Sequence, residues 1–224
     1  MSEHPLIRAI YDDDSPKVKR LLKKEPSLAS FSFEVPKLFW GKISHWIYVG
    51  DTPLHLAAAG SRVEIVRQLI AAAADPNSAL NHRRSSPLHY AADGCPGRAN
   101  WNADRQVETI RSLLEAGADI NAPDKNGATP LHRAVRTRCA AAVKCLLEAG
   151  ADPKLKNKPG STAFHPAVQN TGRGGSGLEA AKAGQREIIR TFLDFGVSGK
   201  LKDGKGKSVA DCAGSYWIRE MLQS

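Results

Sequence analysis

The chain has 224 residues, of which 42% are hydrophobic, enough for one domain with a sizeable core or for a linear array of small units. Its formal net charge of +9 favours anionic partners, whether acidic protein, nucleic acid or a membrane surface, and bears on association rather than on fold. The four cysteines form no C-x-x-C pair and have no histidine at zinc-finger spacing, so neither a disulfide scaffold nor a metal site is expected.

The N-terminal region argues against a secreted or membrane-spanning protein. It carries Asp12, Asp13 and Asp14 where a signal peptide would have an apolar stretch after positive charge. No apolar run in the chain approaches membrane-spanning length. We therefore expect a cytoplasmic protein that makes no membrane contact.

In chain order, the predicted elements are organised by a tetrapeptide that recurs along the sequence. It stands at 52–55 (TPLH), 86–89 (SPLH), 129–132 (TPLH) and 162–165 (TAFH), with fainter copies at 4–7 and 208–211. The leading Thr or Ser suits a helix N-cap. Small residues after the copies, such as Ala57 and Ala58, suit the close approach of two helices.

A second, apolar motif follows each strong tetrapeptide with i, i+3, i+4 spacing, which indicates one face of a helix. Its copies are Val66, Leu69 and Ile70; Ile110, Leu113 and Leu114; Val143, Leu146 and Leu147; and Ile189, Phe192 and Leu193. The stretches 115–119 and 148–152 then contain a glycine suited to the left-handed position that ends a helix. Each unit is predicted to be helix, turn, helix, glycine stop and extended finger.

These two motifs in fixed order resemble the ankyrin repeat, with departures at Ala163, Phe164 and Ala73. The resemblance covers roughly residues 50 to 200 and implies an all-α ankyrin-repeat solenoid, one domain of about six repeats with β-hairpin-like fingers. The expected units are 4–50, degenerate with a finger insertion; 51–84; 85–127 with an insertion; 128–160; 161–206 with an insertion; and 207–224, a C-terminal cap.

The spacing of the motifs locates three insertions. The third and fifth units exceed the period of about 33 residues, and their extra residues fall between the two helices, at 95–103 and 172–184. A further insertion lies in the first finger, at 31–49. Loops carry function more often than the scaffold does, so these segments are candidates for partner contact. The alternative is tolerated length variation.

Four of the seven histidines, His55, His89, His132 and His165, belong to the tetrapeptide, and we expect them to bridge backbone groups of neighbouring units. The others have no nucleophile or carboxylate at a spacing that suggests a dyad, so no catalytic residue, cofactor or enzymatic activity is expected. Cys145 and Cys212 occupy apolar positions of the repeat and are expected to be core residues. Cys139, at an inter-helix turn, and Cys95, in an insertion, are candidate exposed thiols.

In ankyrin-repeat proteins the partner usually lies along the concave face, formed by the finger tips and the exposed ends of the first helices. The resemblance therefore implies partner contacts at Tyr48, Asp51, His82, Arg83, Asp93, Lys125, Asn126, Arg136, Lys158, Gln169, Asn170, Lys205 and Lys207. Cations outnumber acids in this set, which favours an acidic partner. The alternative is that the finger tips are merely solvated.

The inter-helix insertions and the turn between them add Trp101, Arg138 and Arg173 to the partner-binding set. Both loops are expected on the same edge of the solenoid, with Trp101 as an aromatic anchor and Arg173 as a mobile cation. The glycine-rich stretch 170–177 does not fit the P-loop pattern. It suits a flexible connector or, alternatively, an anion nest.

The first insertion is rich in aromatic residues, namely Phe31, Phe33, Phe39, Trp40, Trp46 and Tyr48. Aromatics are over-represented at binding hot spots, yet an insertion must also bury something to stay ordered. Both interpretations remain open. Near the C-terminus, Trp217 is expected to cover the last core layer as a cap.

These patterns lead to two hypotheses about function. The first is a monomeric module that binds an acidic protein through a basic concave face, as an inhibitor, an immunity factor or an adaptor. The second is a binder of nucleic acid or another polyanion, suggested by the lysines of the later fingers, although no groove-reading helix or aromatic RNA-binding motif is present.

Overall fold

The computed structural model describes every residue of the chain except 1–3, 95, 97, 99, 170–178 and 224. Its helices come in pairs, one inner and one outer helix for each repeat. The pairs are α1 (Pro5–Asp12) with α2 (Ser15–Lys24), α3 (Pro53–Ala59) with α4 (Val63–Ala71), α5 (Pro87–Ala92) with α6 (Ala103–Glu115), α7 (Pro130–Arg136) with α8 (Ala140–Glu148), and α9 (Phe164–Ala167) with α10 (Glu179–Asp194). Short turns and a last helix complete the chain: η1 (Pro26–Ala29), η3 (Ala210–Cys212) and α11 (Tyr216–Met221).

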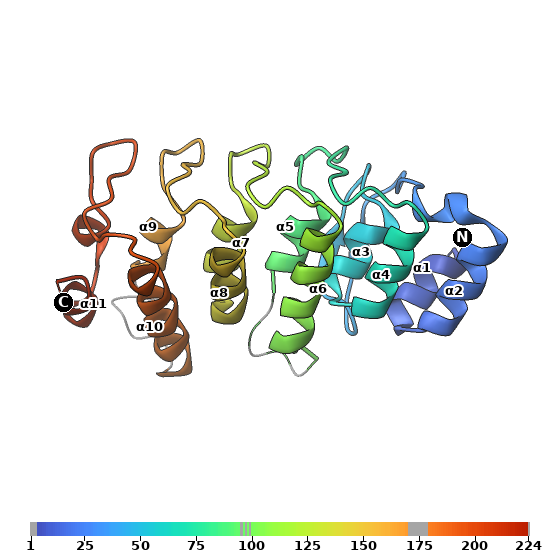
Figure 1. The fold of residues 1–224 in the computed structure, drawn as a ribbon, viewed down its shortest axis with the longest axis horizontal. Helices are drawn as coiled ribbons and strands as arrows, with labels where there is room; N and C mark the ends of the chain where they lie inside the picture. Colours follow the sequence, from blue (N-terminus) through green and yellow to red (C-terminus); the bar gives the residue numbers. More distant parts are fainter. Residues whose placement is uncertain (1–3, 95, 97, 99, 170–178, 224) are drawn as a thin grey trace.

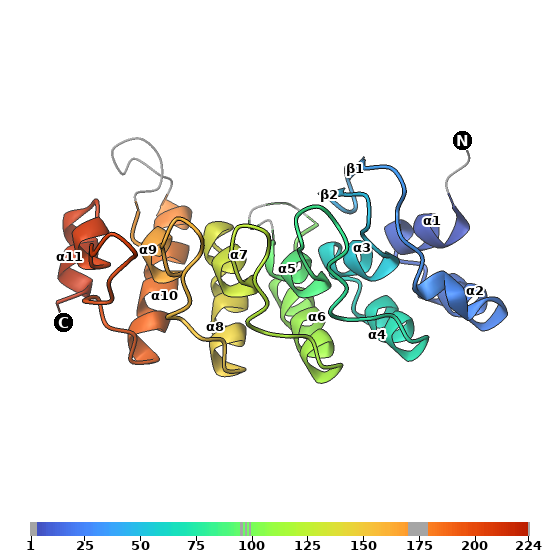
Figure 2. The same ribbon diagram turned by 90° about the horizontal axis from the view of Figure 1, so that it is seen from above.

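The pairs stack in one row from the N-terminus to the C-terminus, and the fingers between them project on the same side of the row (Figure 1). Seen from above, inner helices α1, α3, α5, α7 and α9 lie along one side and their outer partners along the other (Figure 2). Helices pack within their own unit and against the adjacent units. The predicted all-α solenoid is confirmed.

The insertion in the first finger forms the single small sheet of the described residues. Strands β1 (Lys37–Phe39) and β2 (His45–Ile47) pair antiparallel, with Leu38 opposite Trp46 and Phe39 opposite His45. Phe39 and Ile47 are buried, and they fasten this hairpin to the core beside α3. Apart from the hairpin, the described strand structure consists of isolated bridges at the bases of later fingers.

Helix starts and stops follow the repeated motifs. Thr52, Ser86 and Thr129 each cap an inner helix in a reciprocal arrangement, in which the histidine three residues later accepts the backbone N–H of the cap. Outer helices α6 and α8 are followed by Gly117 and Gly150, both of which have positive φ. Ala73 takes the same conformation at φ 64°, so the departure from glycine leaves the turn unchanged.

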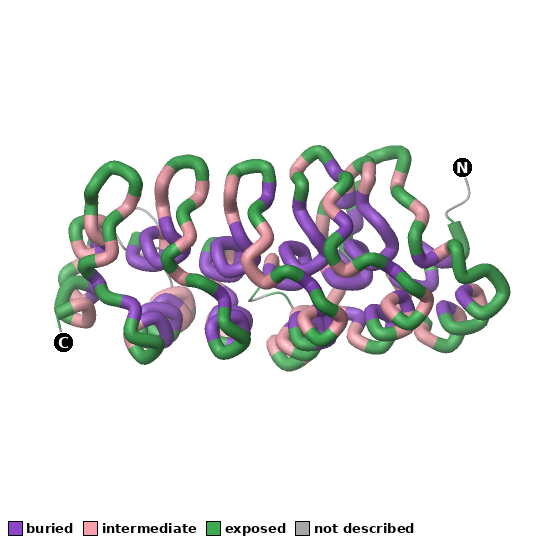
Figure 3. Tube along the Cα trace, turned by 45° about the horizontal axis from the view of Figure 1, so that its top comes forward, coloured by how far each residue is buried: buried purple, intermediate pink, exposed green. Residues whose placement is uncertain are grey.

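Backbone hydrogen bonds tie the finger tips to one another. Lys125 N–H donates to the carbonyl oxygen of Arg83 at 2.7 Å, and Lys158 N–H donates to that of Asn126 at 2.8 Å. Gly204 N–H repeats the pattern towards Gly160 at 2.7 Å. The exposed tips therefore stand above the buried inner helices as a connected row (Figure 3).

The two inter-helix insertions lie where the spacing places them, after α5 and after α9. The second is partly wrong in character, because residues 179–184, expected as loop, form the first turns of α10. These residues extend the helix that carries the apolar face of the fifth unit. Residues 170–178, including Asn170 and Arg173, lie outside the described residues, so their expected place at a shared edge stays a prediction.

The predicted capping residue Trp217 lies near the C-terminal end of the solenoid. Trp217 is partly buried against the core, and the Arg186 guanidinium lies 4.9 Å from the centre of its ring, as suits a capping residue. Among the described helices, none combines the length and the apolar composition needed to cross a bilayer.

Neighbour-only packing makes the central unit sensitive to lost volume. Leu146 on α8 is fully buried, and Leu146→Ala should lower the free energy of unfolding by about 2 to 5 kcal/mol, because the side chain leaves a cavity between adjacent units. Urea denaturation followed by circular dichroism measures this. Leu80→Ala is the control, since Leu80 is 78% exposed, and it should change stability by less than about 0.5 kcal/mol. Equal effects of the two substitutions would contradict the predicted packing.

Candidate functional site

The repeated histidines fix each finger to the helix beneath it. Their Nε2 atoms lie within hydrogen-bond distance of a carbonyl oxygen in the following finger: His55 to Ser85 at 3.0 Å, His89 to Ala128 at 3.0 Å, His132 to Ser161 at 3.1 Å and His165 to Lys207 at 3.2 Å. In each ring Nδ1 accepts the backbone N–H of the Thr or Ser three residues earlier, so Nε2 is the donor. The predicted bridging role is confirmed, and it sets the positions of the finger tips.

Asp51, which was expected at the partner-binding face, lies instead inside the solenoid. Its side chain is fully buried, and its carboxylate accepts hydrogen bonds from Asn81 Nδ2 at 2.8 Å, Tyr90 Oη at 2.7 Å and the Tyr48 N–H at 2.6 Å. Burial, together with this carboxylate, raises the pKa of the Tyr90 phenol and keeps it a donor. Asp51 therefore joins the first three units internally.

A second polar network lies beneath the middle fingers and is centred on Arg133. Arg133 is 95% buried, and its guanidinium donates to Asp124 at 2.7 Å and to Asp93 at 3.4 Å. Arg136 donates to both oxygens of Asp93, at 2.8 and 2.7 Å. Burial alone would raise the pKa of Asp93, but His45 and Arg136 outweigh it and lower that pKa to about 2.

Four of the predicted residues, from three successive units, line one open groove between the fingers and the inner helices. We call it the basic groove; its predicted members are Arg83, Asn126, Arg136 and Lys158. Arg133, Asp124, His132, Asn157, Pro159 and Pro166 complete most of the lining. Because Arg133 neutralises Asp124 internally, the surface of the groove is cationic. Lys125 stands exposed at the adjacent finger tip.

Other predicted contact residues that the structure describes lie outside the lining of the basic groove. His82 is exposed and packs edge-on against the ring of Tyr48 at 4.8 Å. Gln169 is exposed beside Arg138, whose Nη2 lies 3.5 Å from the Gln169 carbonyl oxygen. Lys205 and Lys207 are exposed on the last finger.

Two expectations concern the segments between paired helices. Trp101 is half-buried, and its Nε1 donates to the Gln106 side chain at 3.0 Å, so its part in partner binding stays a prediction. Cys139 is not an exposed thiol: it is fully buried, and burial raises its pKa. Cys145 is buried as expected, Cys212 is half-buried, and Cys95 lies outside the described residues.

Sequence reasoning missed Arg133 and His45. Arg133 follows the tetrapeptide histidine directly, where other units carry Leu56, Tyr90 or Pro166. The role of Arg133 could have been suspected from sequence, because it is a charged residue at a position where those other units have uncharged side chains. His45, whose Nε2 lies 3.5 Å from Asp93, had no such signal, because the contact depends on the hairpin folding back over α5.

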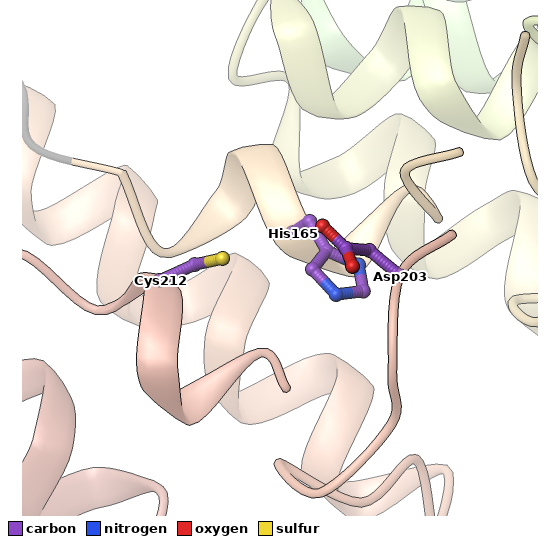
Figure 4. A group of neighbouring side chains, drawn as sticks. All are labelled: His165, Asp203 and Cys212. Atoms are coloured by element: carbon purple, nitrogen blue, oxygen red, sulfur yellow. The ribbon is translucent and has the colours of Figure 1, made fainter. Parts of the chain in front are cut away.

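Within the part of the chain that the structure describes, one group of side chains has metal-binding chemistry. Potential ligand atoms of His165, Asp203 and Cys212 lie within 4.8 Å of one another (Figure 4). Both ring nitrogens of His165 are engaged in the capping and bridging bonds found in the other units. One Asp203 oxygen accepts the Lys205 and Lys207 N–H groups. Because a metal ion would displace the bridge that holds the last finger, the arrangement favours a structural role.

Comparison with known proteins establishes the family. A family model of three ankyrin repeats matches residues 6–122, and a model of many ankyrin repeats matches residues 113–167. The chain therefore belongs to the ankyrin-repeat family, whose repeats are protein–protein interaction modules rather than enzymes.

Relatives share single stretches of repeats with this chain. Alpha-latrotoxin-Lhe1a of Latrodectus hesperus is 39% identical over 88 residues, which cover 39% of this chain and 6% of the toxin. NF-kappa-B inhibitor delta of Mus musculus is 38% identical over 95 residues, 41% of this chain and 25% of the relative. Ankyrin repeat and SOCS box protein 6 of Mus musculus is 31% identical over 107 residues, 48% and 21% of the two chains. The matched stretches thus span a quarter or less of each relative's length.

Proposed function

We propose that this protein binds an acidic partner protein through the basic groove and the neighbouring finger tips, acting as a cytoplasmic monomer in the role of an inhibitor, immunity factor or adaptor. The observation that carries the proposal is the convergence of Arg83, Arg136 and Lys158, from three units, on one groove whose only acidic lining residue among those described is already neutralised. A partner carboxylate that enters the groove meets cations on a backbone whose finger tips are hydrogen-bonded to one another.

The similarity to an NF-kappa-B inhibitor supports an inhibitor or adaptor role, since that relative's name states inhibition of another protein. The binding of nucleic acid or another polyanion is the competing function. It is favoured by the exposed lysines of the later fingers, including Lys154, Lys200 and Lys205. The two partners differ in charge density, and salt dependence therefore separates them.

The test uses charge reversal at cations that have no structural task in the described network. The parent protein, used as bait, should capture the acidic partner from its source cells, and the Lys125→Glu/Lys158→Glu double variant should not. The affinity of the double variant for the purified partner should be at least tenfold lower, because the reversed side chains repel the partner's carboxylates. Lys144→Glu on outer helix α8 is the matched control and should retain the partner. Retention by both baits, or a captured partner without an acidic surface, would refute the proposal.

Salt dependence gives a second expected result. Affinity should fall as salt rises, because the exposed charges are screened over a Debye length of about 8 Å at physiological ionic strength. An acidic protein should give a shallow dependence, whereas nucleic acid gives a steep linear fall of log affinity with log salt. Titrations monitored by fluorescence anisotropy between low and high salt measure the slope. Affinity independent of salt contradicts both alternatives.

A further inference from the structure

The first-finger hairpin carries apolar side chains on both of its faces. Phe39 and Ile47 point into the core, which accounts for one face. Leu38 and Trp46 are paired directly across the strands on the other face, where they are 44% and 48% exposed. A hairpin with one buried face ordinarily alternates apolar inward with polar outward. Packing of the hairpin therefore does not explain Leu38 and Trp46.

Exposed apolar area is concentrated at this place in the molecule. Among the described residues, eight large hydrophobic side chains are exposed, and five of them lie between positions 35 and 49: Val35, Leu38, Trp40, Trp46 and Val49. The remaining three, Leu80, Phe195 and Tyr216, belong to separate parts of the chain. Scattered apolar residues are normal on a protein surface, but a contiguous group indicates an interaction site.

The hairpin forms one side of a shallow, open hollow. Leu38, Trp40, His45, Trp46 and Tyr48 form its wall, and Arg83, Asp93 and Thr137 close it from the side of the next units. We call it the aromatic hollow. An aromatic row leads out of it, since the rings of Trp46 and Tyr48 are stacked at 6.4 Å and His82 meets Tyr48 edge-on.

The hairpin is held in place by bonds to elements far away in the chain. Tyr11 Oη donates to the Trp40 carbonyl oxygen at 2.5 Å, and Arg62 and Asn100 both donate to that of Lys42 at 3.1 Å. The turn requires glycine at position 41, because φ is 104° and an added Cβ would lie 2.8 Å from Tyr11 Oη. A hollow fixed in this way loses little entropy when it is filled.

The aromatic hollow is continuous with the basic groove through Arg83. Arg83 lines both, its Nη1 donates to Tyr48 Oη at 2.8 Å, and its guanidinium lies 5.1 Å from the centre of the Tyr48 ring. The guanidinium of Arg98 lies 4.6 Å from the centre of the Trp40 ring in the hairpin. Apolar surface bordered by cations fits a segment that combines one large apolar side chain with carboxylates.

We propose that the aromatic hollow is the anchor subsite for a linear acidic segment of the partner protein, which inserts one large apolar side chain beside Leu38 and Trp46 and continues over Arg83 into the basic groove. This inference rests on the proposed function and adds the chemistry of the partner to it. The hairpin then supplies affinity through burial of apolar area, while the groove supplies direction and charge selection.

The test selects binders from a phage-displayed library of random 12-residue peptides against the immobilised full chain. The enriched peptides should combine several Asp or Glu residues with one Trp, Phe or Leu. The best of them, synthesised with a fluorophore, should bind Trp46→Ser at least tenfold more weakly than the parent by fluorescence anisotropy, and Trp46→Phe within threefold of the parent. Leu38→Ser should also weaken binding, whereas Tyr216→Ser at the opposite end of the solenoid should not. Unchanged circular dichroism and melting temperature establish that each variant is folded.

The outcomes separate this inference from the function on which it rests. Acidic peptides that bind Trp46→Ser as well as the parent, yet lose affinity for the Lys125→Glu/Lys158→Glu variant, overturn the anchor and leave the proposed function standing. Enriched peptides without acidic residues, unaffected by that double variant, overturn the proposed function. Failure of any peptide to be enriched above the naive library also contradicts the inference, since the hollow would then not hold a short segment.

Discussion

Lowering the pH from 7.5 to 5 should destabilise the protein by about 2 kcal/mol through His89 alone. Burial lowers the pKa of His89 to about 4, below its ordinary value of 6.5, because the ring is 99% buried and bound as a neutral group between two units. Burial also lowers the pKa of His55 and of His132, which add to the effect in the same direction.

The sign follows from proton binding. Below pH 6.5 these histidines are protonated in the unfolded chain but stay neutral in the folded chain. The unfolded state therefore binds more protons, and the free energy of unfolding decreases as the pH is lowered. For His89 the loss extends from about pH 6.5 down to its folded pKa of about 4. At pH 5 the low-pKa carboxylate Asp93 is still ionised in both states, so the histidines dominate this window.

Urea denaturation of the parent and of His89→Gln at both pH values measures this contribution. The variant is expected to be less stable at pH 7.5, because it loses the bridge to Ala128, but its free energy of unfolding should change less with pH. His82→Gln, at an exposed ring, should leave the pH dependence of the parent intact. An unaltered pH dependence in His89→Gln would show that this ring does not titrate as we infer.

Arg133→Met should lower the free energy of unfolding by about 3 to 5 kcal/mol. The substitution leaves the buried Asp124 carboxylate without its ion-pair partner and removes one of the cations around Asp93. Burial would raise the pKa of Asp124, but Arg133 and the N–H groups of Ala128 and Asn126 hold it below its ordinary value. With Arg133 removed, that pKa should rise.

Arg136→Met is the matched control, since it makes the same chemical change at a side chain that is 54% exposed and pairs with the same Asp93. It should cost less than about 1 kcal/mol, because exposed ion pairs contribute little. The Arg133→Met/Asp124→Asn double variant should recover part of the lost stability, because no uncompensated charge then remains at position 124. Equal costs for the two arginine substitutions would contradict the internal role of Arg133.

The sequence by itself determined the repeat architecture. Helix pairs, glycine stops and bridging histidines depend on contacts within a unit or with the next unit, so a local motif repeated in fixed order carries enough information to specify them. The positions of the insertions followed from the spacing of the same motifs. That Arg83, Arg136 and Lys158 line one groove was accessible from sequence, because family alignment places finger tips and the exposed ends of the first helices on one face.

Tertiary structure decided which side chains remain available on that face. Asp51 turned inward because Tyr90 and Asn81, from later parts of the chain, supply donors that no local pattern announces. Arg136 is partly neutralised because α5 brings Asp93 beside it. The role of the aromatic cluster was ambiguous in sequence. Whether Phe39 points inward and Trp46 outward depends on the register of the two strands. It also depends on the bonds that hold the hairpin to Tyr11, Arg62 and Asn100, which form only once the solenoid is assembled.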